Sequence, residues 1–173
     1  MVLVTTTVPW LTDDEQRTWR SFVAATRLLF DQLDRELQRD AGMTHADYEI
    51  LVRLSEEPGG SLRMGGLAER TGSSRSRLSH AVAGLEGDGW VRRERCPTDG
   101  RGALAVLTTK GEAALREAAP GHVRGVRRHL FDQLGASQQR ALRTIGDAVL
   151  GHLEQERADA AEGSPLSPAS RGR

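Results

Sequence analysis

Two short helical patterns separated by one glycine constrain the fold of this chain more than any other feature. The first pattern covers residues 67–70 and ends before Gly72, the residue type that most readily adopts the left-handed turn at a helix end. The second pattern begins after Ser73 or Ser74, either of which is a suitable N-cap, and its apolar stripe consists of Leu78, Val82 and Leu85. Ala68 is small enough for the two helices to cross closely. The sequence therefore predicts a helix-turn-helix.

The face of the second helix that remains for solvent is basic and rich in hydroxyl groups. It carries Arg75, Ser76, Arg77, Ser79 and His80, and its first acidic residue is Glu86. Guanidinium, hydroxyl and imidazole groups on one side of a buried helix suit the major groove of DNA. Among them, Arg77 is the residue that we predict to contact a base, because arginine can bind guanine through two hydrogen bonds. The alternative interpretation is an ordinary solvated helix face.

A predicted β-hairpin follows this helix directly, which is the position of a wing. Strand-like runs at 90–95 and 102–107 are separated by a Pro-Thr-Asp-Gly turn at 97–100. The hairpin carries four arginines: Arg92, Arg93, Arg95 and Arg101. Since side chains alternate along a strand, Arg93 and Arg95 share a face, and we expect both to approach the DNA backbone. Arg92 points the other way and is predicted to be structural.

Together, these residues resemble the MarR family of bacterial transcriptional regulators. Asp99 and Arg101, followed by Leu107 and Thr108, match the family's wing signature of Asp-x-Arg, five residues, then Leu-Thr. The resemblance extends from about residue 12 to 156. It implies that Arg101 meets the minor groove or a phosphate and that Asp99 orients it, although Asp99-Gly100 alone is equally an ordinary turn. It also implies that six positions of the second helix face DNA: Ser74, Arg75, Ser76, Arg77, Ser79 and His80.

Further helices are predicted on both sides of this central unit. Capping boxes at 12–15 and 44–47 begin helices to about residue 39 and over 46–56, and Ser61 caps or precedes the helix that runs through Leu67. A third box at 109–112 begins a helix of about 110–134, with a kink expected at Pro120. Ser137 is expected to cap a last helix that extends to about residue 157 and buries Leu142, Ile145, Val149 and Leu153.

The predicted fold is mainly α, with a small β-hairpin wing. We expect a winged helix-turn-helix DNA-binding domain at 44–108 and a helical dimerisation region formed by 12–40 and 109–157. Residues 1–11 are expected to be a flexible lead and residues 158–173 a disordered tail. The terminal helices carry apolar faces that the small central domain cannot cover alone, so a second copy of the chain is the expected partner.

The net charge of the chain and the composition of its N-terminus limit the classes of protein to which it can belong. The 24 basic and 24 acidic residues give a net charge of zero, so any DNA affinity must arise from local clustering. The N-terminus lacks the basic region of a secretory signal, and no run approaches the ~20 apolar residues of a membrane span. We therefore expect a cytoplasmic protein without a membrane partner. Neither a catalytic motif nor zinc-ligand spacing is found, so we predict no enzyme activity, metal site or cofactor.

The functional prediction is a homodimeric regulator, a repressor, that binds a pseudo-palindromic operator in double-stranded DNA. The family resemblance implies release by a small effector, often aromatic and anionic. The residues named as a hypothesis for such a pocket are Trp19, Phe22, Arg27, His45 and Tyr48. For each of them alone, the simpler interpretation is an ordinary core or surface residue. Two alternatives remain: a thiol-responsive regulator that uses Cys96, the only cysteine, and a winged-helix protein-interaction module.

Overall fold

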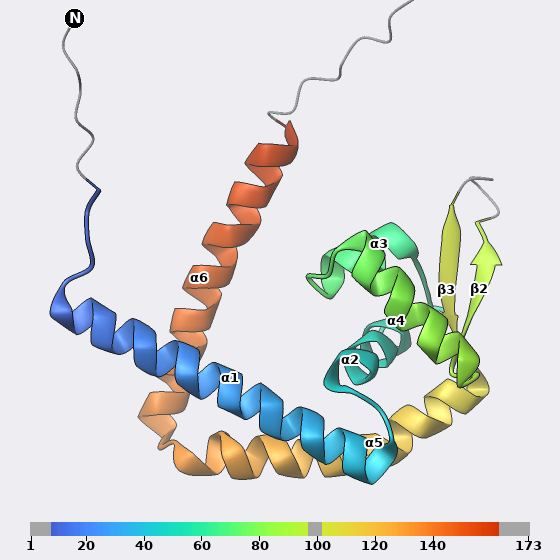
Figure 1. Ribbon diagram of the computed structural model, residues 1–173, viewed down its shortest axis with the longest axis horizontal. Helices are drawn as coiled ribbons and strands as arrows, with labels where there is room; N and C mark the ends of the chain where they lie inside the picture. Colours follow the sequence, from blue (N-terminus) through green and yellow to red (C-terminus); the bar gives the residue numbers. More distant parts are fainter. Residues whose placement is uncertain (1–7, 97–101, 163–173) are drawn as a thin grey trace, which may run out of the picture. The chain divides into compact units, whose positions relative to one another are not determined.

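The computed structural model describes residues 8–96 and 102–162 and divides into two compact units (Figure 1). The first unit, Met1–His129, contains α1 (Asp13–Ala41), α2 (His45–Ser55), β1 (Ser61–Arg63), α3 (Met64–Arg70), α4 (Arg75–Gly87), β2 (Val91–Arg95), β3 (Ala103–Leu107) and α5 (Thr109–His129). The second unit, Leu130–Arg173, contains a short 3-10 helix, η1 (Phe131–Gln133), and α6 (Ala136–Glu162). The predicted mainly helical fold with a β wing is confirmed.

The first two capping boxes form as the sequence predicts. The Thr12 hydroxyl accepts from the Glu15 N–H at 3.3 Å, and the Glu15 carboxylate accepts from the Thr12 N–H at 2.7 Å. Thr44 and Asp47 repeat the arrangement at the start of α2. Gly42 ends α1 with φ 66°, a left-handed conformation that costs glycine little. Local interactions are therefore sufficient to fix where α1 begins and ends and where α2 begins.

The starts of α5 and α6 differ from the prediction. Thr108, not Thr109, caps α5, since its hydroxyl accepts from the Gly111 N–H at 3.0 Å. The helix continues through Pro120 and ends at His129, earlier than expected. α6 begins at Ala136, so Ser137 lies inside the helix rather than at its cap. α6 also extends to Glu162, so residues 158–162 are helical and the expected disordered tail was assigned too early.

The two strands of the expected hairpin pair as β2 and β3, and β1 adds a third strand to form an antiparallel sheet. Its order is β1-β3-β2, with Leu62 opposite Ala105 and Val91 opposite Leu107. The helix through Leu67 begins at Met64, so Ser61 precedes it but does not cap it, and residues 61–63 form β1, a strand that was not predicted. A strand of three residues is too short to show an alternating pattern, and it is stabilised by pairing with a distant segment.

The core of the first unit lies where α2, α3 and α4 meet the sheet. Leu51, Leu54, Leu67 and Val82 are completely inaccessible to solvent, and the predicted stripe residues Leu78 and Leu85 are 1% exposed. Burying one such side chain contributes about 1.5–3 kcal/mol. Leu37 of α1 and Leu115 of α5 join the same core, so the long helices are anchored to the winged helix by apolar packing.

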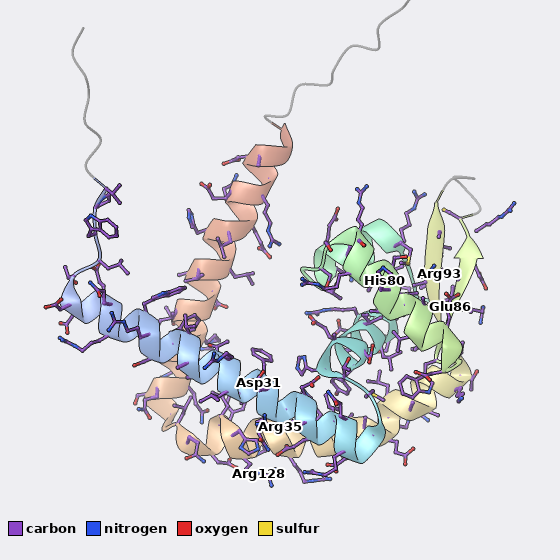
Figure 2. The ribbon with its side chains drawn as sticks, viewed as in Figure 1. Asp31, Arg35, His80, Glu86, Arg93 and Arg128 are labelled. Atoms are coloured by element: carbon purple, nitrogen blue, oxygen red, sulfur yellow. The ribbon has the colours of Figure 1, made fainter. Side chains whose placement is uncertain are left out.

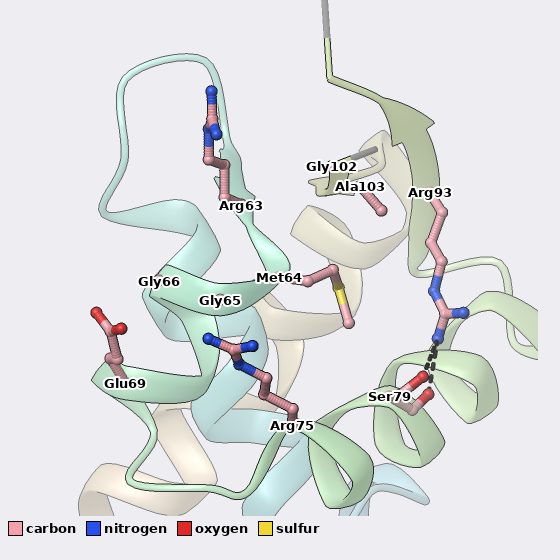
Figure 3. Close-up of a pocket in the computed structure, with 10 residues that line it drawn as sticks. All are labelled: Arg63, Met64, Gly65, Gly66, Glu69, Arg75, Ser79, Arg93, Gly102 and Ala103. Atoms are coloured by element: carbon pink, nitrogen blue, oxygen red, sulfur yellow. Dashed lines mark hydrogen bonds between the residues drawn. The ribbon is translucent and has the colours of Figure 1, made fainter. Parts of the chain in front are cut away.

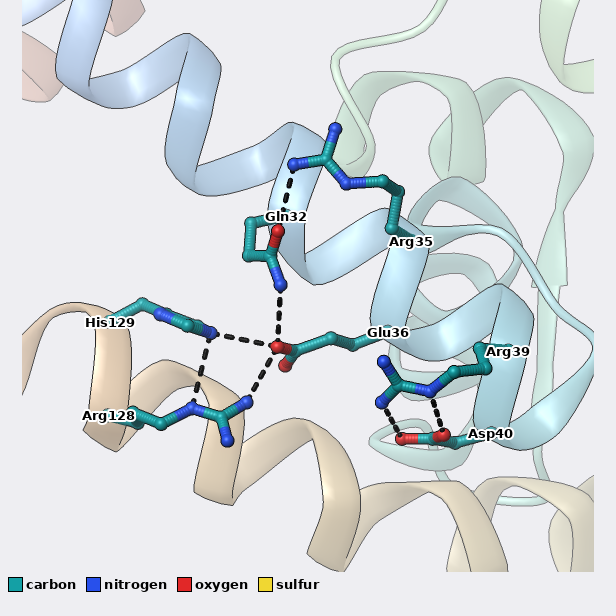
Figure 4. Close-up of polar contacts among 7 residues, drawn as sticks. All are labelled: Gln32, Arg35, Glu36, Arg39, Asp40, Arg128 and His129. Atoms are coloured by element: carbon teal, nitrogen blue, oxygen red, sulfur yellow. Dashed lines mark hydrogen bonds and ion pairs between the residues drawn. The ribbon is translucent and has the colours of Figure 1, made fainter.

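A polar cluster joins α1 to α5 (Figure 4). The Glu36 carboxylate accepts from Arg128 at 2.6 Å, lies 2.8 Å from Nε2 of His129, and accepts from Gln32 at 2.8 Å. The His129 and Gln32 hydrogen bonds, aided by the Arg128 charge, lower the pKa of Glu36 to about 2. A Cβ at Gly125 would lie 2.6 Å from the Glu36 carboxylate, so this glycine permits the close approach of the two helices.

Several apolar side chains on the long helices remain exposed within the single chain. Leu142, Ile145, Val149 and Leu153, which were expected to be buried, are 38–57% exposed. The expectation is wrong for the isolated chain, because the described part of α6 leaves this face open. The exposed apolar residues of α1 and α6 include Trp19, Phe22, Val23, Leu28, Phe30, Leu142, Ile145, Val149, Leu150 and Leu153.

Candidate nucleic-acid interface

The turn between α3 and α4 positions the candidate recognition helix. Gly72 has φ 59°, and the Ser73 N–H donates to the Ala68 carbonyl at 2.9 Å. Ser74 is the N-cap of α4, and its hydroxyl accepts from the Arg77 N–H at 3.3 Å. Because the Ser74 hydroxyl is engaged in this cap, its first role is to begin the helix. The predicted helix-turn-helix is confirmed.

The outer face of α4 is exposed and lacks acidic residues in its first turn. Leu78 faces the core, whereas the polar residues chosen from the sequence are accessible: Arg75, Ser76, Arg77, Ser79 and His80. The structure thus brings five of the predicted contact residues together on one helix. Asp99 and Arg101 lie outside the described residues.

Arg93 connects β2 to the recognition helix; Figure 2 labels Arg93 and Glu86, and Figure 3 draws the hydrogen bonds from Arg93 to Ser79. Its guanidinium donates to the Ser79 carbonyl oxygen at 2.7 Å and lies 3.2 Å from the Glu86 carboxylate. The Arg93 backbone N–H also donates to Glu86, at 2.9 Å. These contacts hold the base of the wing against α4, a role that the sequence did not predict for Arg93.

The neighbouring strand arginines differ in their partners. Arg92 forms an ion pair with Glu94 at 2.6 Å, in agreement with a role within the strand. Arg95 is exposed at the end of β2, and its side chain has no hydrogen bond or ion pair with any residue that the structure describes. Its guanidinium is therefore available to an external anion.

A groove of about 540 Å³ lies between α3, α4 and the wing (Figure 3). It is lined by Arg63, Met64, Gly65, Gly66, Glu69, Arg75, Ser79, Arg93, Gly102 and Ala103. Three of these residues, Arg75, Ser79 and Arg93, were predicted from the sequence to contact DNA, whereas Arg63, Gly65 and Gly66 were not. In the sequence, the only feature that points to Arg63 is its position as one more arginine near the helix-turn-helix. Arg63 is the last residue of β1, a strand that was not predicted, and it directly precedes α3.

The five effector candidates fall into two groups. Trp19 and Phe22 are exposed on α1 with ring centroids 6.4 Å apart, and Arg27 is exposed on the same helix. His45 and Tyr48, at the start of α2, instead contact His122 of α5, at centroid distances of 5.5 and 4.4 Å. None of the five lines the groove between α3, α4 and the wing.

His122 is the residue of this ring cluster that sequence reasoning missed. Its Nδ1 is buried and has no hydrogen-bond partner among the described residues. Burial, and to a smaller degree the proximity of His45, lowers the pKa of His122. The ring of Phe30 completes the cluster by an edge contact with His45 at 5.1 Å. The cluster joins α1, α2 and α5.

The structure also bears on Cys96, on metal binding and on membrane-spanning segments. The Cys96 side chain is buried, with 6% exposure, which disfavours the thiol-responsive alternative because oxidation requires access to the sulfur. Within residues 8–96 and 102–162, no group of three or more His, Cys, Asp or Glu side chains is placed to hold a metal ion. No helix in the same ranges combines the length and apolarity required to cross a membrane.

Comparison with known proteins agrees with this geometry. A family model described as MarR family matches residues 41–102. The transcriptional regulator HosA of Escherichia coli O111:H- is 30% identical over 119 residues, which are 62% of this chain and 87% of HosA. The crystal structure of Sco3205, a MarR family transcriptional regulator from Streptomyces coelicolor in complex with DNA, has 53% identity and a TM-score of 0.82 and covers 86% of this chain and 92% of Sco3205.

A second solved structure, AbsC from Streptomyces coelicolor, also described as a MarR family transcriptional regulator, is 44% identical with a TM-score of 0.80. The match covers 86% of this chain and 99% of AbsC. The fold and the basic helix beside a wing define a winged-helix transcriptional regulator. The chain belongs to the MarR family, as the sequence resemblance implied.

Proposed function

We propose that this regulator is a sequence-specific DNA-binding repressor. The observation that carries the proposal is the exposed, basic and acid-free first turn of α4, supported from behind by the core residue Leu78 and from the side by the wing. The structure of Sco3205 with DNA supports the same ligand. Because its proposed ligand is chromosomal DNA, we place the regulator in the cytoplasm.

We assign the reading of bases to the first turns of α4 and the holding of the backbone to the wing. Arg77 is the proposed guanine contact, with Arg75, Ser76 and His80 beside it on the exposed face. Arg95 is the proposed strand contact to phosphate, and Arg101 with Asp99 retains the role implied by the family signature. Arg93 is proposed to contribute through its contacts with Ser79 and Glu86, which position the wing.

We propose that two copies bind one pseudo-palindromic operator. The exposed apolar residues of α1 and α6 support the proposal, because a monomer gains nothing from large apolar side chains in water. In this arrangement residues 12–40 and 109–157 form the dimerisation region and residues 44–108 form each DNA-binding unit. Two-fold symmetry then requires half-sites about one helical turn, ~10 bp, apart.

We propose that a small aromatic anion releases the dimer from DNA. The support is the ring cluster of His45 and Tyr48 with His122, which joins the long helices to α2 and is thus placed to alter the setting of the winged helix. Trp19, Phe22 and Arg27 are retained as candidate contacts. Substitutions that preserve DNA binding and abolish release support this assignment; unchanged release in all five variants contradicts it.

The first experiment is fluorescence anisotropy of the purified protein with its own upstream intergenic DNA and with unrelated DNA, over a salt series. A specific regulator is expected to prefer its operator by ~10³-fold or more and to lose affinity steeply as salt rises. Arg77→Ala is expected to remove most of the preference. The proposal is contradicted if the protein binds both DNAs with equal affinity and a genome-wide binding experiment also finds no preferred site.

A further inference from the structure

The only lysine among the 173 residues is bonded to the end of the recognition helix. Lys110 is the second residue of α5, and its Nζ donates at 2.6 Å to the backbone carbonyl of Asp88, the C-cap of α4. In Figure 1 the start of α5 lies beside the C-terminal end of α4. The Thr108 hydroxyl makes a second contact at this junction, a hydrogen bond of 2.8 Å to the Gly89 carbonyl. Side chains at the start of α5 therefore hold the end of α4.

The ammonium group of Lys110 supplies a charge that α4 lacks. The last turn of α4 contains no basic residue, whereas Glu86 and the C-cap Asp88 carry carboxylates at this end. The C-terminal end of a helix has a partial negative charge, which a nearby cation stabilises. Because α4 provides no such cation itself, the charge on Lys110 contributes to holding the recognition helix in place.

The same amine is exposed and differs chemically from the other strong bases of the chain. The sequence has 24 lysine and arginine residues, and all of them except Lys110 are arginines. A guanidinium keeps its proton in proteins, whereas the amine of lysine is the usual target of acetylation. Acetylation removes the positive charge of lysine. A reagent that acylates side-chain amines therefore acts at one place in this chain, the junction of α4 and α5.

We propose that Lys110 is an acylation site through which the regulator loses affinity for its operator. The donor is an activated acyl group carried by a phosphate or a thioester. The amine nitrogen forms a bond to the acyl carbon, and the bond from that carbon to the oxygen or sulfur of the donor breaks. The leaving group departs with the electron pair, and the amine releases a proton. The product amide is neutral, so the contact with Asp88 loses its charge.

The proposal rests on the proposed function of α4 as the recognition helix. Lys110 bonds to the C-terminal end of α4, whereas the proposed base contacts lie in its first turns. Acylation should therefore change how α4 is held without removing a phosphate contact. Affinity for the operator is expected to fall about fivefold, while affinity for unrelated DNA and the slope of log affinity against log salt change little.

The test treats the full-length protein with acetyl phosphate or with acetyl coenzyme A, which separates the two kinds of donor. Peptide mass spectrometry should find an acetyl group on Lys110, and anisotropy should show the reduced operator affinity. The matched control is Lys110→Arg, which keeps a cation but leaves no lysine in the chain. Its operator affinity should match that of the wild type and should not respond to either donor.

Lys110→Gln mimics the neutral product and should lower operator affinity as acetylation does. The control for charge alone is Arg116→Gln, which removes a cation from α5 that is paired with Glu112 and not with α4. It should leave operator affinity unchanged. If Lys110→Gln lowers the melting temperature and leaves operator affinity unchanged, the contact is only structural and the proposal is overturned.

The remaining outcomes separate the two proposals. A wild-type protein without operator preference overturns the proposed function itself. Where the wild type prefers its operator, the acylation proposal alone is wrong if neither donor modifies Lys110 in the folded protein, or if the acetylated protein keeps its operator affinity. Equal losses for both DNAs in Lys110→Gln, with a slope reduced by about 0.9, identify Lys110 as a phosphate contact and also overturn it.

Discussion

The guanidinium of Arg93 donates to the carbonyl oxygen of Ser79 at 2.7 Å and so ties the first wing strand to the recognition helix. Glu86, one residue before the end of α4, accepts from the backbone N–H of the same arginine and pairs with its side chain. The angle between wing and helix is therefore set by side chains rather than by the loop alone. DNA that contacts both elements requires this angle to be maintained.

Arg93→Ala is expected to lower affinity for operator and unrelated DNA about tenfold, because the wing loses its attachment to α4. The salt slope should change little, since the removed guanidinium is bonded to protein groups. In the same background, a further Arg101→Ala substitution should cost less than it does in the wild type, a coupling that a double-mutant cycle by anisotropy measures.

The matched comparison is Arg95→Ala, at a strand position without a described partner. It should reduce the salt slope by about 0.9, as expected for one lost phosphate contact. If Arg93→Ala reduces the slope by the same amount and shows no coupling to Arg101, Arg93 is a direct phosphate contact and the positioning role is wrong.

Glu36→Gln is expected to destabilise the protein at pH 7 by about 1.5–3 kcal/mol, the usual contribution of hydrogen bonds to a charged group. Because the pKa of Glu36 is about 2 in the folded chain against 4.5 ordinarily, its stabilisation is complete above pH 4.5 and is lost as pH falls toward 2. Urea unfolding at several acidic pH values should show that the free energy of unfolding falls more steeply with pH for the wild type than for the variant. Parallel pH profiles would contradict the assignment.

His122→Phe is expected to reduce the acid sensitivity of folding near neutral pH. Burial lowers the pKa of His122 below 6.5, so its neutral form is favoured in the folded chain. Its contribution is therefore complete above pH 6.5 and declines as pH falls through the lowered pKa. Between pH 7.5 and 5, the melting temperature should change less with pH for the variant than for the wild type. The control is His152→Phe, at an exposed position of α6, which should keep the pH profile of the wild type.

Ile145→Glu is expected to prevent self-association without unfolding the chain. Ile145 is 57% exposed in the single chain, so the substitution removes no internal packing but places a charge on the apolar face of α6. Sedimentation velocity should show a monomer, and binding to a two-half-site operator should weaken by two orders of magnitude or more, about 3 kcal/mol. Thr144→Glu, on the opposite face by helical spacing, should remain dimeric. A dimeric Ile145→Glu protein would rule out this face as the interface.

The elements that could be predicted from sequence are those with local causes. Thr12 and Thr44 each lie three residues before the acid that completes their capping box, and Gly72 ends α3 through its own backbone conformation. The apolar stripe of α4 follows from helical periodicity within 13 residues. The exposed basic face follows from the same periodicity, because burying Leu78 necessarily turns its polar neighbours outward.

The elements that were missed depend on segments far apart in the chain. β1 exists because β3, more than 40 residues later, pairs with it. Glu36 and His129 are 93 residues apart, and no local pattern indicates that they share a hydrogen bond. The partners of Arg93 and the groove over Gly65 and Gly66 likewise require α4 and the wing to be folded against each other.

By itself, the sequence determined the helix boundaries at strong caps, the helix-turn-helix, the wing and the basic surface, because each depends on residues within a few turns of one another. Only the tertiary structure decided which arginine is available to DNA and which is bonded to protein, and where α1 and α5 approach closely. The physical reason is that hydrogen bonds and close packing depend on distances of a few ångströms between segments, which sequence periodicity does not specify.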